Sequence, residues 1–216
     1  MQFNRKQLLL YAVTDRTWVG RQTLFEQVED ALRGGVTMVQ LREKRLKLDE
    51  FVAEAVKVKE LCHSFGVPLI INDSLEVALM CGADGVHVGA EDVSVSEIRK
   101  IAGKNFIIGA TAKTVEQAVN AQNLGADYLG VGAVFPSSTK TNAVRITKEN
   151  LKKICSSVLI PVVAIGGITS ENVKEIYGGG VSGIAVVSAI FSAENIVETA
   201  KELKQKAIEA VGAENE

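Results

Sequence analysis

The sequence predicts a single-domain α/β protein with the (β/α)8, or TIM-barrel, architecture, and three observations support this. A segment that opens with glycine and continues into an apolar strand recurs four times along the chain. A second apolar run lies in each interval between these segments, and stretches with helical spacing separate the runs. A repeated strand and helix unit of about 25 residues is typical of a barrel with eight such units.

The expected strands share a short apolar core that ends in polar residues or glycine. In order they are LLLYAVTD (8–15), GVTMVQLR (35–42), VPLIIND (67–73), GADGVHVG (82–89), NFIIGATA (105–112), GADYLGVG (125–132), IPVVAIGG (160–167) and GVSGIAVVS (180–188). Helices are expected over 51–62, 114–124 and 170–179, with Thr114 and Ser170 as N-caps. An open doubly wound sheet is the competing architecture, but the first strand lacks a following G-x-G-x-x-G.

Composition indicates one soluble domain over residues 1–216, of which 47% are apolar, with a net charge of −2. The charge balance argues against a nucleic-acid partner. The apolar run 8–13 is too short to span a membrane or to form a signal peptide, so we expect a cytoplasmic protein. Cys62, Cys81 and Cys155 form no C-x-x-C pair, which favours reduced thiols. The tail after about residue 210 is predicted to fray.

Charged side chains follow several expected strands, and in this fold such residues gather at one end of the barrel. Arg42 and Lys44 follow the second strand, and Lys140 lies in the loop VFPSSTKTNA after the sixth. Asp73 and Asp92 follow the third and fourth strands. Mg²⁺ binds one or two carboxylates and completes its shell with phosphate oxygens, while Arg and Lys neutralise the remaining phosphate charge. These residues predict a Mg²⁺-bridged pyrophosphate.

A second anion site is expected across the barrel. The turn 166–167 is Gly-Gly and leads to an expected helix, and VVSAIF presents Ser188 together with backbone N–H groups. The hydroxyls of the loop after the sixth strand can face this site. Two anion sites in one barrel imply two phosphorylated substrates.

Each of these residues also has a structural interpretation. Arg42 and Lys44 can form surface salt bridges, Asp73 can be the N-cap of the helix SLEVALMC, and Asp15 can cap the first loop. The pair at 166–167 can be a tight turn that only glycine tolerates. Their shared position at one barrel end favours the functional interpretation.

The motifs QLREK, IND, GADGVHVGAED, GADYLGVGAVFPSSTK, AIGGI and VVSAIF, in this order, resemble the thiamine phosphate synthase (thiamine-phosphate pyrophosphorylase) family over nearly the whole chain. The resemblance implies a Mg²⁺-dependent transferase of thiamine biosynthesis. Its substrates would be 4-amino-5-hydroxymethyl-2-methylpyrimidine pyrophosphate and a thiazole phosphate, and its products thiamine phosphate and pyrophosphate. The mechanism would ionise the pyrimidine substrate, so neither a strong nucleophile nor a strong base is required.

The resemblance also assigns roles by motif. Catalysis would fall to Arg42, Lys44, Thr111 and Lys140, and the metal to Asp73 and Asp92. The substrate-binding set would be Gln40, Leu41, Arg42, Glu43, Lys44, Asn72, Thr111, Ser137, Ser138, Thr139, Lys140, Gly167, Val187 and Ser188. Departures from the family pattern are Thr111 for a frequent serine, Lys113 for a frequent histidine, and Ala90 and Ala133 for glutamine and proline. We expect His87 in the core or behind the ligand-contacting residues rather than in direct catalysis.

Two alternatives remain open. A thiazole tautomerase of the related branch would be expected to carry a histidine at the position of Lys113 and would not need both Asp73 and Asp92. A non-catalytic sensor of thiazole phosphate or thiamine phosphate would not need the carboxylates either. A metal-dependent pentose-phosphate epimerase would need histidine ligands that the two histidines of the chain cannot supply. The sequence leaves the oligomeric state, including a homo-oligomer, undecided.

Overall fold

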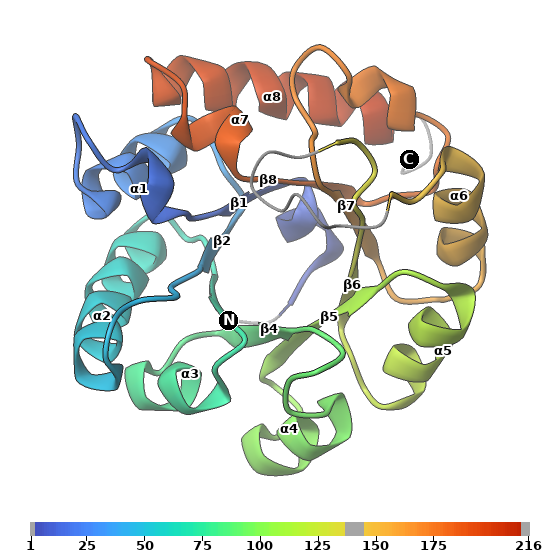
Figure 1. Cartoon of the computed structure of the whole chain (residues 1–216), viewed down its shortest axis with the longest axis horizontal. Helices are drawn as coiled ribbons and strands as arrows, with labels where there is room; N and C mark the ends of the chain where they lie inside the picture. Colours follow the sequence, from blue (N-terminus) through green and yellow to red (C-terminus); the bar gives the residue numbers. More distant parts are fainter. Residues whose placement is uncertain (1–2, 137–144, 213–216) are drawn as a thin grey trace.

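The fold is the predicted barrel, seen in a computed structural model that describes residues 3–136 and 145–212. Within these residues, eight parallel strands pair in the order β1 to β8, and β8 returns to pair with β1. The strands are β1 (Leu10–Val13), β2 (Met38–Leu41), β3 (Leu69–Asn72), β4 (Gly85–Val88), β5 (Ile107–Ala112), β6 (Tyr128–Val131), β7 (Val162–Ile165) and β8 (Gly183–Val186). Figure 1 shows the helices around the outside of the barrel.

The helices connect the strands and mostly begin at capping residues of the usual kind. They are α1 (Leu24–Arg33), α2 (Leu48–Ser64), α3 (Leu75–Cys81), α4 (Val95–Ala102), α5 (Val115–Asn123), α6 (Lys148–Ser156), α7 (Ser188–Phe191) and α8 (Ile196–Val211). Short 3-10 turns are η1 (Arg5–Leu8), η2 (Arg16–Trp18) and η3 (Val173–Ile176). Thr114 caps α5 as predicted, since its side chain accepts from Gln117 N. The N-cap of α3 is Ser74, so the capping interpretation of Asp73 is wrong.

One predicted helix is replaced by a shorter element. The helix expected over 170–179 is η3, and its N-cap is Asn172 rather than Ser170. Val173 and Ile176 are buried three residues apart, a spacing that suits a 3-10 turn. Glycines at positive φ follow at Gly178 and Gly180, and they end the turn.

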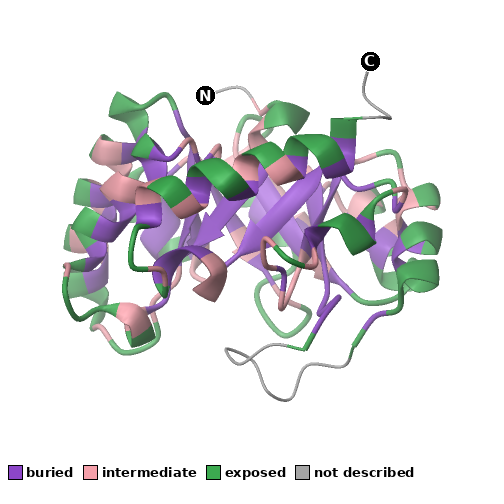
Figure 2. Cartoon of the chain, turned by 90° about the horizontal axis from the view of Figure 1, so that it is seen from above, coloured by how far each residue is buried: buried purple, intermediate pink, exposed green. Residues whose placement is uncertain are grey.

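Two apolar clusters of buried residues form the core, and Figure 2 shows that the barrel strands between the helices are buried. The larger layer fills the space between the strands and the helices. The smaller layer lies inside the barrel and includes Tyr11, Met38, Ile70 and Tyr128. Phe3 packs against this inner layer from the segment before β1, with its ring 5.9 Å from that of Tyr128. The inner layer therefore supplies a packed floor rather than a pore.

The remaining sequence expectations concern the cysteines, the tail and the membrane. All three cysteines are free thiols, as predicted, and burial raises the pKa of the Cys62 thiol to about 12. Helix α8 extends to Val211, and residues 213–216 of the tail lie outside the described residues. In the part of the chain that the structure describes, no helix is long and apolar enough to cross a membrane.

Candidate active site

A cavity of about 640 Å³ lies at the carboxyl ends of the strands. Its lining includes residues from all eight strands or the loops that follow them, because the carboxyl ends of parallel barrel strands meet at one face. The charged lining residues are Arg42, Lys44, Asp73, Glu91, Asp92 and Lys113. Cations and carboxylates therefore share one concave surface, as the sequence predicts.

The two cations after β2 are each held by a neighbouring carboxylate. Arg42 Nη1 donates to Asp15 Oδ2 at 2.7 Å, and Lys44 Nζ donates to Asp73 Oδ2 at 2.5 Å. Burial disfavours the Asp15 carboxylate, but hydrogen bonds from Thr17 and the nearby Arg42 guanidinium outweigh it and lower the pKa of Asp15. Asp15 thus caps η2, which agrees with the capping interpretation, and it also orients Arg42.

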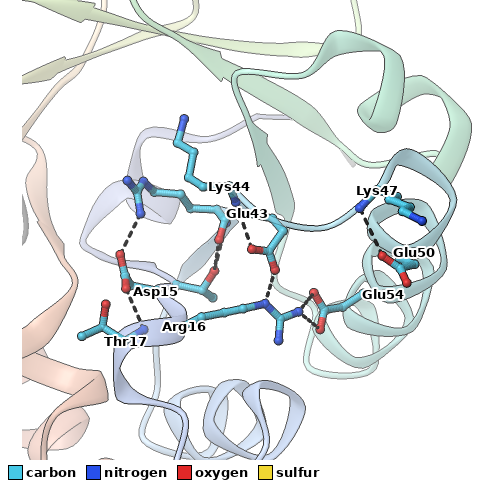
Figure 3. Close-up of polar contacts among 10 residues, drawn as sticks. Asp15, Arg16, Thr17, Glu43, Lys44, Lys47, Glu50 and Glu54 are labelled. Atoms are coloured by element: carbon cyan, nitrogen blue, oxygen red, sulfur yellow. Dashed lines mark hydrogen bonds and ion pairs between the residues drawn. The ribbon is translucent and has the colours of Figure 1, made fainter.

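Arg16 fixes the loop that carries these cations. Its guanidinium bonds to Glu43 of the loop and to both carboxylate oxygens of Glu54 on α2, at 2.7 and 2.6 Å for Glu54 (Figure 3). The Glu43 side chain is only 3% exposed. The resulting ion-pair network connects the β1 loop, the β2 loop and α2, and it sets the position from which Arg42 and Lys44 reach the cavity.

The two carboxylates predicted for the metal follow adjacent strands, β3 and β4. Asp73 has φ +63°, a left-handed conformation that Asp tolerates better than most residues, and its N–H donates to the His87 carbonyl at 2.8 Å. Asp92 Oδ2 accepts from Gly89 N at 2.7 Å. Both residues line the cavity. Among the described residues, no group of three or more His, Cys, Asp or Glu side chains is placed to hold a metal. The predicted metal ligands are therefore limited to these two carboxylates.

The floor of the cavity carries a hydrogen-bonded chain of side chains. Gln40 Nε2 donates to Tyr11 Oη at 2.7 Å, and Tyr11 Oη lies 2.8 Å from Tyr128 Oη. Tyr128 Oη lies 3.1 Å from His87 Nδ1, and His87 Nε2 lies 3.1 Å from Thr111 Oγ1. Burial raises the pKa of both tyrosine hydroxyls above their usual range, so both stay protonated. His87 is accordingly a linking residue that also lines the cavity.

Across the cavity, the Gly166-Gly167 turn follows β7 and approaches other backbone closely. Gly167 has φ +65°, and a Cβ on it would lie 2.2 Å from the Pro136 carbonyl oxygen. Only glycine fits there, which supports both the tight-turn interpretation and a surface of exposed backbone. Val187 and Ser188 line the same region of the cavity.

The predicted substrate residues divide into three groups. Those that line the cavity are Gln40, Arg42, Lys44, Asn72, Thr111, Gly167, Val187 and Ser188. Leu41 and Glu43 do not line it, because Leu41 is buried against the helices and Glu43 is bonded to Arg16. Ser137, Ser138, Thr139 and Lys140 lie outside the described residues.

Several lining residues were not predicted from the sequence. Tyr11, Glu91 and Gln117 contribute polar atoms, and Val13 and Ile168 contribute apolar surface. Tyr11 stands in a run of apolar residues and is indistinguishable there from a core aromatic. Glu91 immediately precedes Asp92 in a loop at the carboxyl end of a strand, and that position was the available signal.

Comparisons with known proteins agree with this geometry. A family model described as thiamine monophosphate synthase matches residues 10–190. The thiamine-phosphate synthase of Ruminiclostridium cellulolyticum is 50% identical over 194 residues, which are 90% of this chain and 92% of that protein. Thiamine-phosphate synthase 2 of Streptococcus pneumoniae serotype 4 is 48% identical over 193 residues, 89% and 92% of the two chains. A solved thiamine phosphate pyrophosphorylase from Pyrococcus furiosus superposes with a TM-score of 0.89 at 40% identity, covering 96% and 99%.

The barrel and the charged cavity at its carboxyl face are those of a TIM-barrel enzyme. With a family model that matches most of its length and relatives near half identical, the chain belongs to the thiamine monophosphate synthase family.

Proposed function

We propose that the chain carries out the activity of its family as a thiamine-phosphate synthase in the cytoplasm. It joins 4-amino-5-hydroxymethyl-2-methylpyrimidine pyrophosphate to a thiazole phosphate and releases pyrophosphate. The observation that carries this proposal is the arrangement of Arg42 and Lys44 with Asp73 and Asp92 around one cavity, opposite the turn at Gly167. A polyanion bridged by a divalent cation matches the first group, and a phosphate monoester matches the second.

The residues present fit Mg²⁺. Two carboxylates from adjacent loops are the protein ligands that Mg²⁺ commonly takes, with water and phosphate oxygens as the others. Asp73 Oδ2 already accepts a hydrogen bond from a cation, the Lys44 ammonium, at 2.5 Å. When bound, Mg²⁺ would neutralise charge on the pyrophosphate; Asp73 and Asp92 would hold it, and Lys44 would turn towards a phosphate oxygen.

The chemistry assigned to this chain is electrostatic. The C–O bond between the pyrimidine methylene and the pyrophosphate breaks, both electrons leave with pyrophosphate, and the thiazole nitrogen bonds to the resulting carbocation. Arg42 and Lys44 stabilise the charge that grows on the leaving group. Gln40, Asn72 and Thr111 orient the pyrimidine, and the turn at Gly167 with Ser188 holds the thiazole phosphate, so that the two reacting atoms meet.

Two observations favour the synthase over the tautomerase. Lys113, which lines the cavity, stands where the tautomerase is expected to have a histidine. Both carboxylates that coupling requires also line the cavity. A sensor would have no use for this charge arrangement beyond binding.

The test is a direct assay of thiamine phosphate formed from the two substrates with Mg²⁺, run beside an assay of thiazole tautomerisation without the pyrimidine. We expect coupled product, and its loss when the metal is chelated. Folded protein that yields no coupled product would refute the proposal; tautomerisation alone would support the first alternative, and binding without turnover the second.

A further inference from the structure

The cavity floor connects two substrate-facing side chains that lie on different strands. Gln40 on β2 and Thr111 on β5 both line the cavity, but they are far apart in the sequence and their strands do not pair. The chain through Tyr11, Tyr128 and His87 joins them inside the barrel. Tyr128 is the central member, is 0% exposed, and is not itself among the cavity-lining residues.

The backbone around this chain leaves room for its rings. A Cβ on Gly109 would lie 2.2 Å from Tyr128 Cζ and 2.4 Å from His87 Nδ1. A Cβ on Gly130 would lie 2.9 Å from His87 Cε1. Neither glycine has positive φ, so close approach rather than backbone conformation requires the missing side chain. The adjacent strands β5 and β6 thus carry glycine where the rings of His87 and Tyr128 meet.

The donors and acceptors of the chain fit a direction that runs from Gln40 to Thr111. Because Gln40 Nε2 donates to Tyr11 Oη, the Tyr11 proton is free to go to Tyr128 Oη. The Tyr128 proton then goes to His87 Nδ1, which must be unprotonated to accept it. In this direction Nε2 carries the imidazole proton and donates it to Thr111 Oγ1. Thr111 keeps its own hydroxyl proton to donate into the cavity.

We propose that Tyr128 is a positioning residue of the active site: its hydroxyl orients Tyr11 and Gln40 on one side, and on the other fixes the His87 tautomer that directs Thr111 towards the substrate. The kinetic part rests on the proposed function, since Gln40 and Thr111 are the assigned pyrimidine ligands. The tautomer is a property of the protein without substrate. The two parts can consequently fail separately.

The first test replaces the hydroxyl by hydrogen in Tyr128→Phe, which retains the ring and the packing. We expect kcat/KM for the pyrimidine pyrophosphate to fall on the order of tenfold, the usual cost of leaving buried polar groups unpaired. KM for the thiazole phosphate should stay within twofold, because the turn at Gly167 is not part of the chain. Tyr177→Phe makes the same chemical change at a half-exposed site and should leave both constants unchanged. The proposal would be overturned if KM for the thiazole phosphate rose by as much as kcat/KM for the pyrimidine pyrophosphate fell. It would also be overturned if neither constant changed.

The second test reads the tautomer by nitrogen-15 NMR of labelled histidine in the substrate-free protein. We expect His87 with the proton on Nε2 in the wild type and a mixture of tautomers in Tyr128→Phe. His63, which pairs with Asp84 at 2.8 Å on the outside of the barrel, is the internal control and should not change. A wild-type proton on Nδ1, or the same His87 spectrum in both proteins, would contradict the assigned direction.

A variant one bond further along separates the two halves of the chain. Tyr11→Phe removes the contact to Gln40 but leaves the hydrogen bond from Tyr128 to His87 in place. Its His87 spectrum should match the wild type while kcat/KM for the pyrimidine substrate falls. This variant also keeps the proposal testable if Tyr128→Phe does not fold. Loss of the tautomer in Tyr11→Phe would assign the positioning role to Tyr11 instead and would overturn the proposal for Tyr128.

Discussion

Lys44 Nζ lies 2.5 Å from Asp73 Oδ2, so a predicted pyrophosphate ligand is paired with a predicted metal ligand. The Asp73 side chain is about one-third exposed and Lys44 about half, which makes this a solvent-accessible pair that is weak in energy. We therefore expect a divalent cation to displace the ammonium at little cost. We predict that metal binding at Asp73 releases Lys44 towards a phosphate of the substrate.

Removal of either carboxylate should raise the metal requirement. For Asp73→Ala and Asp92→Ala we expect turnover to fall on the order of 10- to 100-fold at low Mg²⁺, with partial recovery when Mg²⁺ is raised. The measurement is initial rate against Mg²⁺ concentration. Asp49→Ala, an exposed carboxylate in the first turn of α2, is the control and should behave as the wild type. Unchanged kinetics in both Asp73→Ala and Asp92→Ala would remove the metal assignment.

Asp15 should stabilise the fold only while it is ionised. Its pKa is depressed below the ordinary value of 3.8, so its contribution is full above that value and is lost as pH falls through the lower folded pKa. We expect Asp15→Asn to lower the free energy of unfolding by about 1 kcal/mol at pH 7. Urea denaturation at pH 7 and at pH 3 measures this. The gap between the two proteins should shrink at pH 3; a constant gap would contradict the ion-pair explanation.

Gly109→Ala should disturb the cavity floor, because its Cβ would lie 2.2 Å from Tyr128 Cζ. Overpacking of this kind costs about 1–3 kcal/mol, which urea denaturation detects. Gly20→Ala is the matched control, since no described atom lies within 4 Å of its Cβ and its φ is not positive. Equal stability of the Gly109 and Gly20 variants would show that the rings have room to move.

Gly167→Ala should raise KM for the thiazole phosphate, because the new Cβ would push against the Pro136 carbonyl and deform the turn. Steady-state kinetics with each substrate varied in turn measures this. Gly178→Ala is the control for conformation alone: its φ of +70° is similar, but no described atom lies within 4 Å of the Cβ. A change in KM for the pyrimidine pyrophosphate alone would show that the turn binds that substrate instead.

The loop after β6 should serve both substrates, a prediction that falls outside the described residues. Lys140→Ala should impair chiefly the pyrimidine substrate and the chemical step, because it removes a cation from the leaving group. Ser137→Ala should chiefly raise KM for the thiazole phosphate. Both are measured with the same pair of kinetic series, and exchanged effects would refute the division of roles.

The fold was predictable because each strand carries its own signal. The glycine-led segments and the apolar runs between them mark all eight strands, and parallel strands leave few ways to arrange them. Charged residues such as Arg42 and Asp73 could be assigned to one site, since each directly follows a strand. Element η3 could not be predicted as a 3-10 turn, because its apolar spacing also fits an α-helix.

The cavity floor could not be predicted from the sequence for a different reason. Tyr11 and Tyr128 are 117 residues apart and belong to strands that do not pair, so their contact depends on side chains that meet inside the closed barrel. Gly109 and Gly130 look like ordinary strand glycines until the rings that occupy their space are known. The functions of these four residues are properties of the assembled interior.

The stacking of Phe3 on Tyr128 joins the beginning of the chain to the reaction face. The ring centroids are 5.9 Å apart with planes inclined by 28°, and the next ring, His87, is 5.5 Å from Tyr128. Three aromatic rings in succession thus connect the segment before β1 to His87, which contacts Thr111. We expect a purification tag or reporter fused at the amino terminus to disturb the contact between Phe3 and Tyr128 more than one placed after α8.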